Sequence, residues 1–172
     1  STTAAYGSTS TTVTVTGTND APITTAVDVI GAITEGSTLT DSGSITFTDV
    51  DTTDRPTASQ SPVSISALKA DGTTPLVLTA PQQAAINAAF SVAAAGGNTN
   101  NGAINWSYAI SEGDLDFLAA GETVTAIFRI TVSDSKGGSD SKDVTITLKG
   151  TNDAPVNTRP ATATTTEDSS VA

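Results

Sequence analysis

The chain contains no cysteine, no methionine and no histidine. Without cysteine it can form no disulfide, thiol nucleophile or zinc–thiolate site. Without histidine, the common Ser/His/Asp triad and histidine-based metal sites are excluded as well. A cysteine-free chain is compatible with a secreted bacterial protein that crosses membranes unfolded.

Basic residues are also scarce: seven lysines and arginines stand against eighteen aspartates and glutamates, which gives a net charge of −11. This sign argues against nucleic acid and anionic membranes as partners and favours cations. No apolar run approaches the ~20 residues of a membrane span, so we expect no membrane insertion. The acidic residues occur singly or in short clusters, and a purely solvated acidic surface remains the alternative.

What the chain does have is a repeated phrase. Residues 17–22 and residues 150–155 both read Gly-Thr-Asn-Asp-Ala-Pro. Proline restricts φ and lacks an N–H, so neither copy fits inside a central strand or a helix. An identical phrase at both ends of a domain-sized span marks repeat boundaries. We therefore expect 1–18 to be the last strand of a preceding repeat plus linker, 19–151 one complete repeat, and 152–172 a linker and the start of the next repeat.

Composition and apolar periodicity predict an all-β fold. Threonine, serine, alanine, glycine, asparagine and aspartate dominate, whereas lysine, glutamate and leucine are few, a composition that favours strands and turns. Apolar and polar residues alternate in several short segments, which indicates half-buried strands. The expected strands cover residues 11–16, 25–34, 44–48, 62–68, 75–79, 104–110, 124–132 and 144–148. Seven to eight strands without alternating helices predict an immunoglobulin- or cadherin-like antiparallel β-sandwich.

One segment departs from the strand pattern. Residues 81–90 begin with proline, are rich in alanine and place Ile86 and Phe90 four positions apart, which predicts a short helix over one edge of the sandwich. An apolar crossover loop is the alternative. Trp106 lies in the alternating segment 104–110, so we expect it in the core; a sugar-stacking platform is the other role open to this ring.

The acidic turns gather at the two ends of the predicted sandwich. Because consecutive strands alternate between the ends, the turns at 49–54 and 134–140 share one end with the incoming linker, and the turns at 35–41 and 112–122 share the other with the outgoing linker. The candidate side chains at the first end are Asn19, Asp20, Asp49, Asp51, Asp54 and Asp134. Those at the second end are Glu35, Asp114, Asp116, Asn152 and Asp153.

Carboxylates that converge need a counter-ion. Two of them ~4 Å apart repel by about 4 kcal/mol at an effective dielectric constant of about 20. Oxygen donors in Asp-x-Asp spacing, with no histidine or cysteine, favour Ca²⁺ over transition metals, and Mg²⁺ prefers more rigid octahedral sites. We therefore predict Ca²⁺ at one or both linkers, with acidic turns that splay apart in solvent as the alternative.

Three motifs, in order, resemble the VCBS-type repeats of giant bacterial RTX-type adhesins. They are the Thr-Asn-Asp-Ala-Pro linkers, residues 43–51 (GSITFTDVD) and residues 115–122 (LDFLAAGE). The resemblance covers nearly the whole repeat. It implies a cadherin- or immunoglobulin-like extender domain with calcium at the junctions between repeats.

The resemblance also implies ligand roles for individual residues. At the incoming end it implies a cation shared by Asp20, Asp49 and Asp51, with Asn19 beside them. The matching set at the outgoing end is Glu35, Asp116, Asn152 and Asp153.

The expected function is therefore structural and non-catalytic: an extender repeat of a type I secreted, extracellular adhesin on the bacterial surface, serving cell adhesion and biofilm formation. Its partners would be neighbouring repeats joined through Ca²⁺-bridged linkers. An adhesive module that binds a glycan or a protein is the alternative, and it needs an exposed aromatic or polar groove. A more remote alternative is that the chain is part of an extracellular glycosidase that uses two carboxylates for catalysis. Lone strands in 1–16 and 156–172, where 166–169 echo 34–37, predict a monomer that associates weakly end to end.

Overall fold

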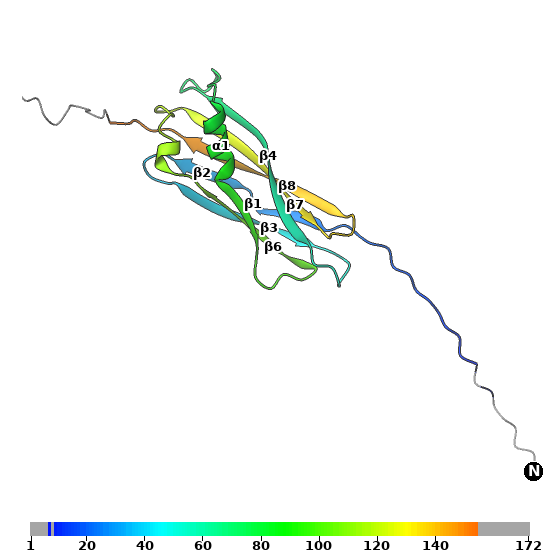
Figure 1. Ribbon diagram of the computed structural model, residues 1–172. Helices are drawn as coiled ribbons and strands as arrows, with labels where there is room; N and C mark the ends of the chain where they lie inside the picture. Colours follow the sequence, from blue (N-terminus) through cyan, green and yellow to red (C-terminus); the bar gives the residue numbers. More distant parts are fainter. Residues whose placement is uncertain (1–6, 8, 155–172) are drawn as a thin grey trace, which may run out of the picture.

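Two four-stranded sheets pack face to face through the alternating apolar residues of their strands (Figure 1). The computed structural model describes residues 7 and 9–154. The strands are β1 (Ile23–Asp28), β2 (Ile30–Thr34), β3 (Thr40–Thr48), β4 (Thr57–Leu68), β5 (Phe90–Ala94), β6 (Asn101–Ala109), β7 (Thr123–Ser133) and β8 (Ser139–Lys149). The predicted all-β, immunoglobulin-like sandwich is confirmed, with eight strands and one short α-helix in the described residues.

The order of the strands is that of an immunoglobulin-like sandwich. One sheet runs β1-β3-β6-β5 and the other runs β2-β8-β7-β4. The pairs are antiparallel except β2 with β8, which is parallel from Ile30 opposite Thr145 to Thr34 opposite Lys149. The strand predicted over 25–34 is divided, because a bulge near the end of β1 bends the chain and β2 then joins the other sheet.

Aromatic rings fill the centre between the sheets. The rings of Phe90 and Phe128 stack with centroids 4.3 Å apart, and Trp106 stacks on Phe90 at 6.1 Å. Trp106 is 1% exposed, and its Nε1 donates a hydrogen bond of 2.6 Å to the Asp28 carbonyl. Gly43 leaves room for this ring, since a Cβ there would lie 2.6 Å from Trp106 Cζ2. The expectation that Trp106 belongs to the core is confirmed.

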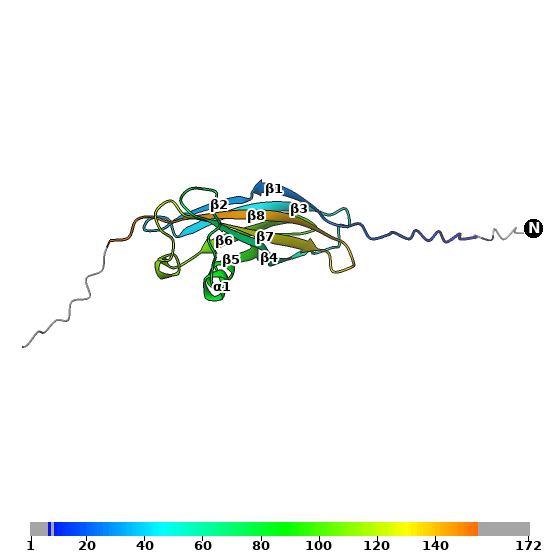
Figure 2. The same cartoon turned by 90° about the horizontal axis from the view of Figure 1, so that it is seen from above.

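Helix α1 (Ala80–Ala88) connects the edge strand β4 of one sheet to the edge strand β5 of the other (Figure 2). Thr79 and Gln82 form a capping box at its start, and proline occupies the first turn. Tyr108 of β6 donates its hydroxyl proton to the Ile86 carbonyl at 3.1 Å, which fixes the helix on the sandwich. The predicted helix is confirmed but ends two residues early. Phe90 instead begins β5, because it pairs with Tyr108.

The strand predicted over 75–79 is wrong. In this segment Pro75 forms an isolated bridge with Leu68, and Leu76 N donates to the Ala67 carbonyl at 2.9 Å. Proline has no N–H to donate, and Thr79 already caps the helix, so the ladder cannot extend. The other strands predicted between the linkers are present, most with longer bounds than expected.

The two linkers lie at opposite ends of the sandwich, blue and orange in Figure 1. The strand predicted over 11–16 is not formed: its Val13 and Val15 are 79% and 90% exposed, and no described residue pairs with it. A strand needs a neighbour for its backbone hydrogen bonds. The echo predicted at 166–169 lies outside the described residues. In residues 7 and 9–154, no helix has the length and apolarity to cross a membrane.

Candidate metal centre at the incoming pole

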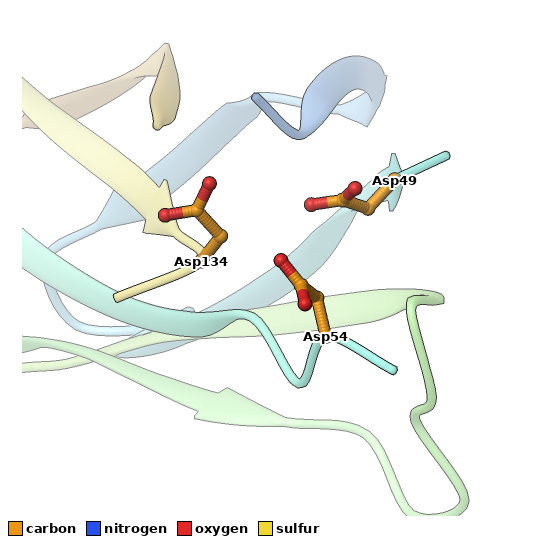
Figure 3. Close-up of side chains that lie close together, drawn as sticks. All are labelled: Asp49, Asp54 and Asp134. Carbon is orange, nitrogen blue, oxygen red and sulfur yellow. The ribbon is translucent and has the colours of Figure 1, made fainter. Parts of the chain in front are cut away.

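The end of the sandwich where the first linker enters, here called the incoming pole, holds three buried carboxylates. Asp49 follows β3, Asp54 lies in the β3–β4 turn and Asp134 follows β7; they are 4%, 1% and 4% exposed. Each offers an oxygen within 4.8 Å of the other two. Figure 3 shows the three side chains pointing toward one another, Asp49 and Asp54 from the β3–β4 connection and Asp134 from the end of β7. Burial of three acids at one point is costly unless their charge is compensated.

Local hydrogen bonds hold these side chains in place. Asp51 N donates to Asp49 Oδ1 at 2.9 Å, and Asp54 N donates to the Asp51 carbonyl at 2.9 Å. Asp134 Oδ1 accepts from Lys136 N at 2.7 Å and from Gly138 N at 2.9 Å. These bonds form two tight turns, in which the backbone holds the carboxylates of Asp49 and Asp134 directly and fixes the main chain at Asp54.

Two oxygens of the cluster remain unsatisfied. Asp49 Oδ2 and Asp54 Oδ2 are buried and have no hydrogen-bond partner among the described residues. The other oxygen of Asp54 accepts the Lys136 ammonium. One lysine offsets only part of the charge of three carboxylates. A small, hard cation bound by oxygen ligands fits the remaining two atoms, and the donor set suits Ca²⁺ better than a transition metal.

The incoming linker is attached to this cluster. Asn19 Nδ2 donates to Asp134 Oδ2 at 2.8 Å, and this bond is the largest cause that holds the pKa of Asp134 below its ordinary value. Asp20 N donates to Asp51 Oδ2 at 2.8 Å, while the side chain of Asp20 is exposed. The resemblance gave Asp20 a carboxylate role; the structure shows its backbone N–H in contact with the pole. An ideal Cβ on Gly138 would lie 2.7 Å from Ala21 Cα, so the linker packs closely on the β7–β8 turn.

Asp140 is a contact that the candidate set did not include. Its Oδ2 accepts from Thr24 N at 2.8 Å and from Thr24 Oγ1 at 2.6 Å, and these bonds, the side-chain one first, lower the pKa of Asp140. Thr24 is buried. This pair joins β1 to β8 across the two sheets, just inside the linker. Its signal in the sequence was its place as the second acid of the predicted turn 134–140.

The opposite end, the outgoing pole, holds the second linker. Glu35 is 1% exposed; its Oε2 accepts from Thr151 N at 2.7 Å, and its Oε1 has no partner among the described residues. Gly150 is buried, and an ideal Cβ there would lie 2.5 Å from the Ala119 carbonyl oxygen. The predicted placement of Glu35 beside the outgoing linker therefore agrees with the structure. The predicted ligands Asn152 and Asp153 are exposed.

Two predicted ligands of the outgoing pole, Asp114 and Asp116, do not join a buried acidic cluster of the described residues. Asp114 and Asp116 are exposed and line a hollow at the start of α1 with Pro81. No cluster of three acids in the described part of the chain includes them. Residues 112–114 form a 3₁₀ turn, which the spacing of the acids does not predict.

Glu112 takes their place near the outgoing linker. An ideal Cβ on Gly36 would lie 3.8 Å from Glu112 Oε1 and 3.6 Å from Thr151 Oγ1. Glu112 was outside the candidate set. Its signal in the sequence is its place at the start of the acidic turn 112–122, which was predicted to share an end with the outgoing linker.

No family model and no curated protein matches this sequence. Among solved structures, the chain is similar to the ASH / PapD-like domain of human CEP192 (PapD-like domain 7), with a TM-score of 0.45 and 10% identity. The match covers 87% of this chain and 99% of that chain.

Proposed function

We propose that residues 19–151 are an extender repeat of a large bacterial surface adhesin, a non-catalytic unit of the VCBS type. In this proposal the repeats are joined end to end through junctions that Ca²⁺ stabilises. The observation that carries it is the way in which the two poles hold two copies of the same linker phrase.

Each pole binds a different part of that phrase. The outgoing pole binds its first two residues, Gly150 and Thr151. The incoming pole binds its third and fourth residues, through Asn19 and the backbone of Asp20. The two copies also share a local bond: the asparagine amide donates to the next residue's carbonyl at 3.2 Å in both.

A single linker can therefore be held by two units at once. The last residue bound to the preceding unit is followed directly by the first residue bound to the next, with no free residue between them. The outgoing pole of one unit and the incoming pole of the next would then meet. The linkers lie at opposite ends of the sandwich (Figure 1), so units joined in this way form a rod.

Calcium would hold this junction rigid. Asp49, Asp54 and Asp134 would bind the ion, and the free oxygen of Glu35 would face the same junction from the preceding unit. Bound Ca²⁺ neutralises the acids that otherwise repel one another, and it stabilises the folded state by mass action. The described aromatic side chains are buried or half-buried, so the described surface offers no aromatic platform for a glycan.

Thermal unfolding in Ca²⁺ and in chelator tests the proposal. We expect Ca²⁺ to stabilise the chain by about 2.7 kcal/mol at a hundredfold excess over its dissociation constant. Asp54→Asn should abolish most of this gain. Asp143→Asn makes the same charge change on the outer face of β8, where Asp143 pairs with Arg129, and should preserve it. Equal melting temperatures in Ca²⁺ and chelator would refute the proposal.

Scattering tests the mechanical part. In a chain that carries two or more of these units in tandem, the maximum dimension should be longer in Ca²⁺ than in chelator. A dimension that chelator leaves unchanged would show that calcium does not set the angle between units.

A further inference from the structure

The β7–β8 turn presents a lysine to the three buried carboxylates. The Lys136 ammonium contacts Asp54 Oδ1, and the Asp54 side chain is 0% exposed. The backbone of this turn is specialised: Ser135 has φ of 63° and Gly137 has φ of 110°, so Lys136 stands between two residues in the left-handed region. A serine rarely adopts that conformation. Asp134 stabilises the turn by accepting from Lys136 N and Gly138 N.

Several carboxylates attract this one ammonium. Contact with Asp54 is the main cause that raises the pKa of Lys136, and the charges of Asp51 and Asp134 add to it. The lysine therefore compensates the cluster in the structure without metal. The compensation is incomplete, because Asp49 Oδ2 and Asp54 Oδ2 remain buried without partners.

The Lys136 side chain is also partly exposed to solvent. The side chain of Lys136 is 52% exposed. It lines a cleft of about 250 Å³ together with Asp51 and the linker residues 17–19. The lysine therefore borders solvent on one side and the buried carboxylate of Asp54 on the other.

We propose that Lys136 is a built-in counter-ion that holds the place of the divalent cation and is displaced from Asp54 when the cation binds. This inference rests on the proposed calcium site. Lys136 stabilises the protein without metal and lowers its affinity for calcium, because the ion must compete with the ammonium. When Ca²⁺ binds, the contact between Lys136 and Asp54 is lost and the ion takes its place at the junction between units. The strength of that contact sets the Ca²⁺ concentration at which the site fills.

The test is calorimetric titration of the full chain with Ca²⁺, together with unfolding in chelator. Lys136→Met should bind Ca²⁺ about tenfold more tightly than the wild type, a factor that corresponds to about 1.4 kcal/mol. The same variant should melt at a lower temperature in chelator. Lys69→Met makes an identical charge change beyond the far end of β4 and should alter neither quantity. Lys136→Arg, which keeps a cation in the turn, should bind no more tightly than the wild type.

Nuclear magnetic resonance separates displacement from a general charge effect. Saturating Ca²⁺ should move the side-chain signal of Lys136 to the position of a solvated lysine and leave that of Lys69 in place. An unchanged Lys136 signal would overturn the inference, because the ammonium would then still contact Asp54. If Lys136→Met fails to fold, the Lys136 signal of the wild type decides alone. Equal affinity of wild type and Lys136→Met would overturn only this inference, whereas absence of binding to both would overturn the proposed calcium site as well.

Discussion

The repeated phrase allows one substitution to be tested at two equivalent positions. Gly17 and Gly150 are the same letter of the phrase, but their surroundings differ. An ideal Cβ on Gly150 would lie 2.5 Å from the Ala119 carbonyl oxygen and 2.7 Å from Leu118 Cβ. A Cβ on Gly17 would have nothing within 4 Å. We therefore expect Gly150→Ala to destabilise the sandwich and Gly17→Ala to have almost no effect.

The free-energy cost of Gly150→Ala can be estimated from the atoms that the added methyl group would displace. Overpacking by one methyl group costs about 1–3 kcal/mol. The backbone at Gly150 cannot shift freely, because its N–H donates to the Glu122 carbonyl at 3.0 Å and its carbonyl accepts from Gly121 N at 3.3 Å. Weakening one of these bonds adds about 0.5–1.5 kcal/mol. The sum, about 3 kcal/mol, corresponds to a fall in melting temperature of roughly 10 °C for a domain of this size.

Urea and thermal unfolding of both variants, followed by circular dichroism, measure the difference. The expected result is a lower urea midpoint for Gly150→Ala with an unchanged m-value, and a Gly17→Ala curve that overlies the wild type. Equal destabilisation in the two variants would refute the statement that Gly150 is packed closely against Leu118 and Ala119 at the outgoing pole. It would instead indicate that the first residue of the phrase must be glycine because of its backbone conformation and not because of its neighbours.

Two further predictions concern the pair that joins the sheets and the centre of the core. The hydrogen bonds from Thr24 hold the pKa of Asp140 below its ordinary value. The ionised Asp140 therefore stabilises the folded state fully above the unfolded pKa of about 4. This stabilisation is lost as the pH falls through the lower pKa of the folded state. Asp140→Asn should therefore cost about 1–2 kcal/mol in urea unfolding at pH 7 and much less at pH 3; a gap that does not change with pH would contradict this. Trp106→Phe removes the bond to the Asp28 carbonyl and part of the ring between the sheets, and should lower stability by about 2–4 kcal/mol. A urea midpoint within error of the wild type would show that the indole is not a packing centre.

Most strands of the two sheets could be predicted because the alternation of apolar and polar residues is a property of each segment by itself. Segments 104–110 and 124–132 alternate except at Ala109 and Ile127, and such alternation predicts one buried face. The sharing of each pole between one linker and particular turns follows from the alternation of strand direction. These two rules were sufficient to place Asp49, Asp54 and Asp134 at one end of the sandwich.

The remaining features depend on choices that no local pattern records. Phe90 lies four residues after Ile86 and would be buried on a helix or on a strand; only its pairing with Tyr108 decides in favour of the strand. Asp114 and Asp116 were placed by spacing as ligands of the outgoing pole, but both are exposed and line a hollow with Pro81. Lys136 is a single lysine in a glycine-rich turn. Nothing in its sequence context distinguishes it from a solvated residue.

The parallel pairing of β2 with β8 determines how the unit would respond to tension. The chain enters through β1 and β2 and leaves directly after β8. A pull on the two ends therefore draws β2 and β8 in opposite directions along their common axis. The five residue pairs between them would be sheared together, whereas the strands of a hairpin pulled apart at one end lose their bonds one at a time. Force that passes along a row of such units would be borne by the pairs of β1 with β3 and by this short parallel pairing before it reached the aromatic core behind them.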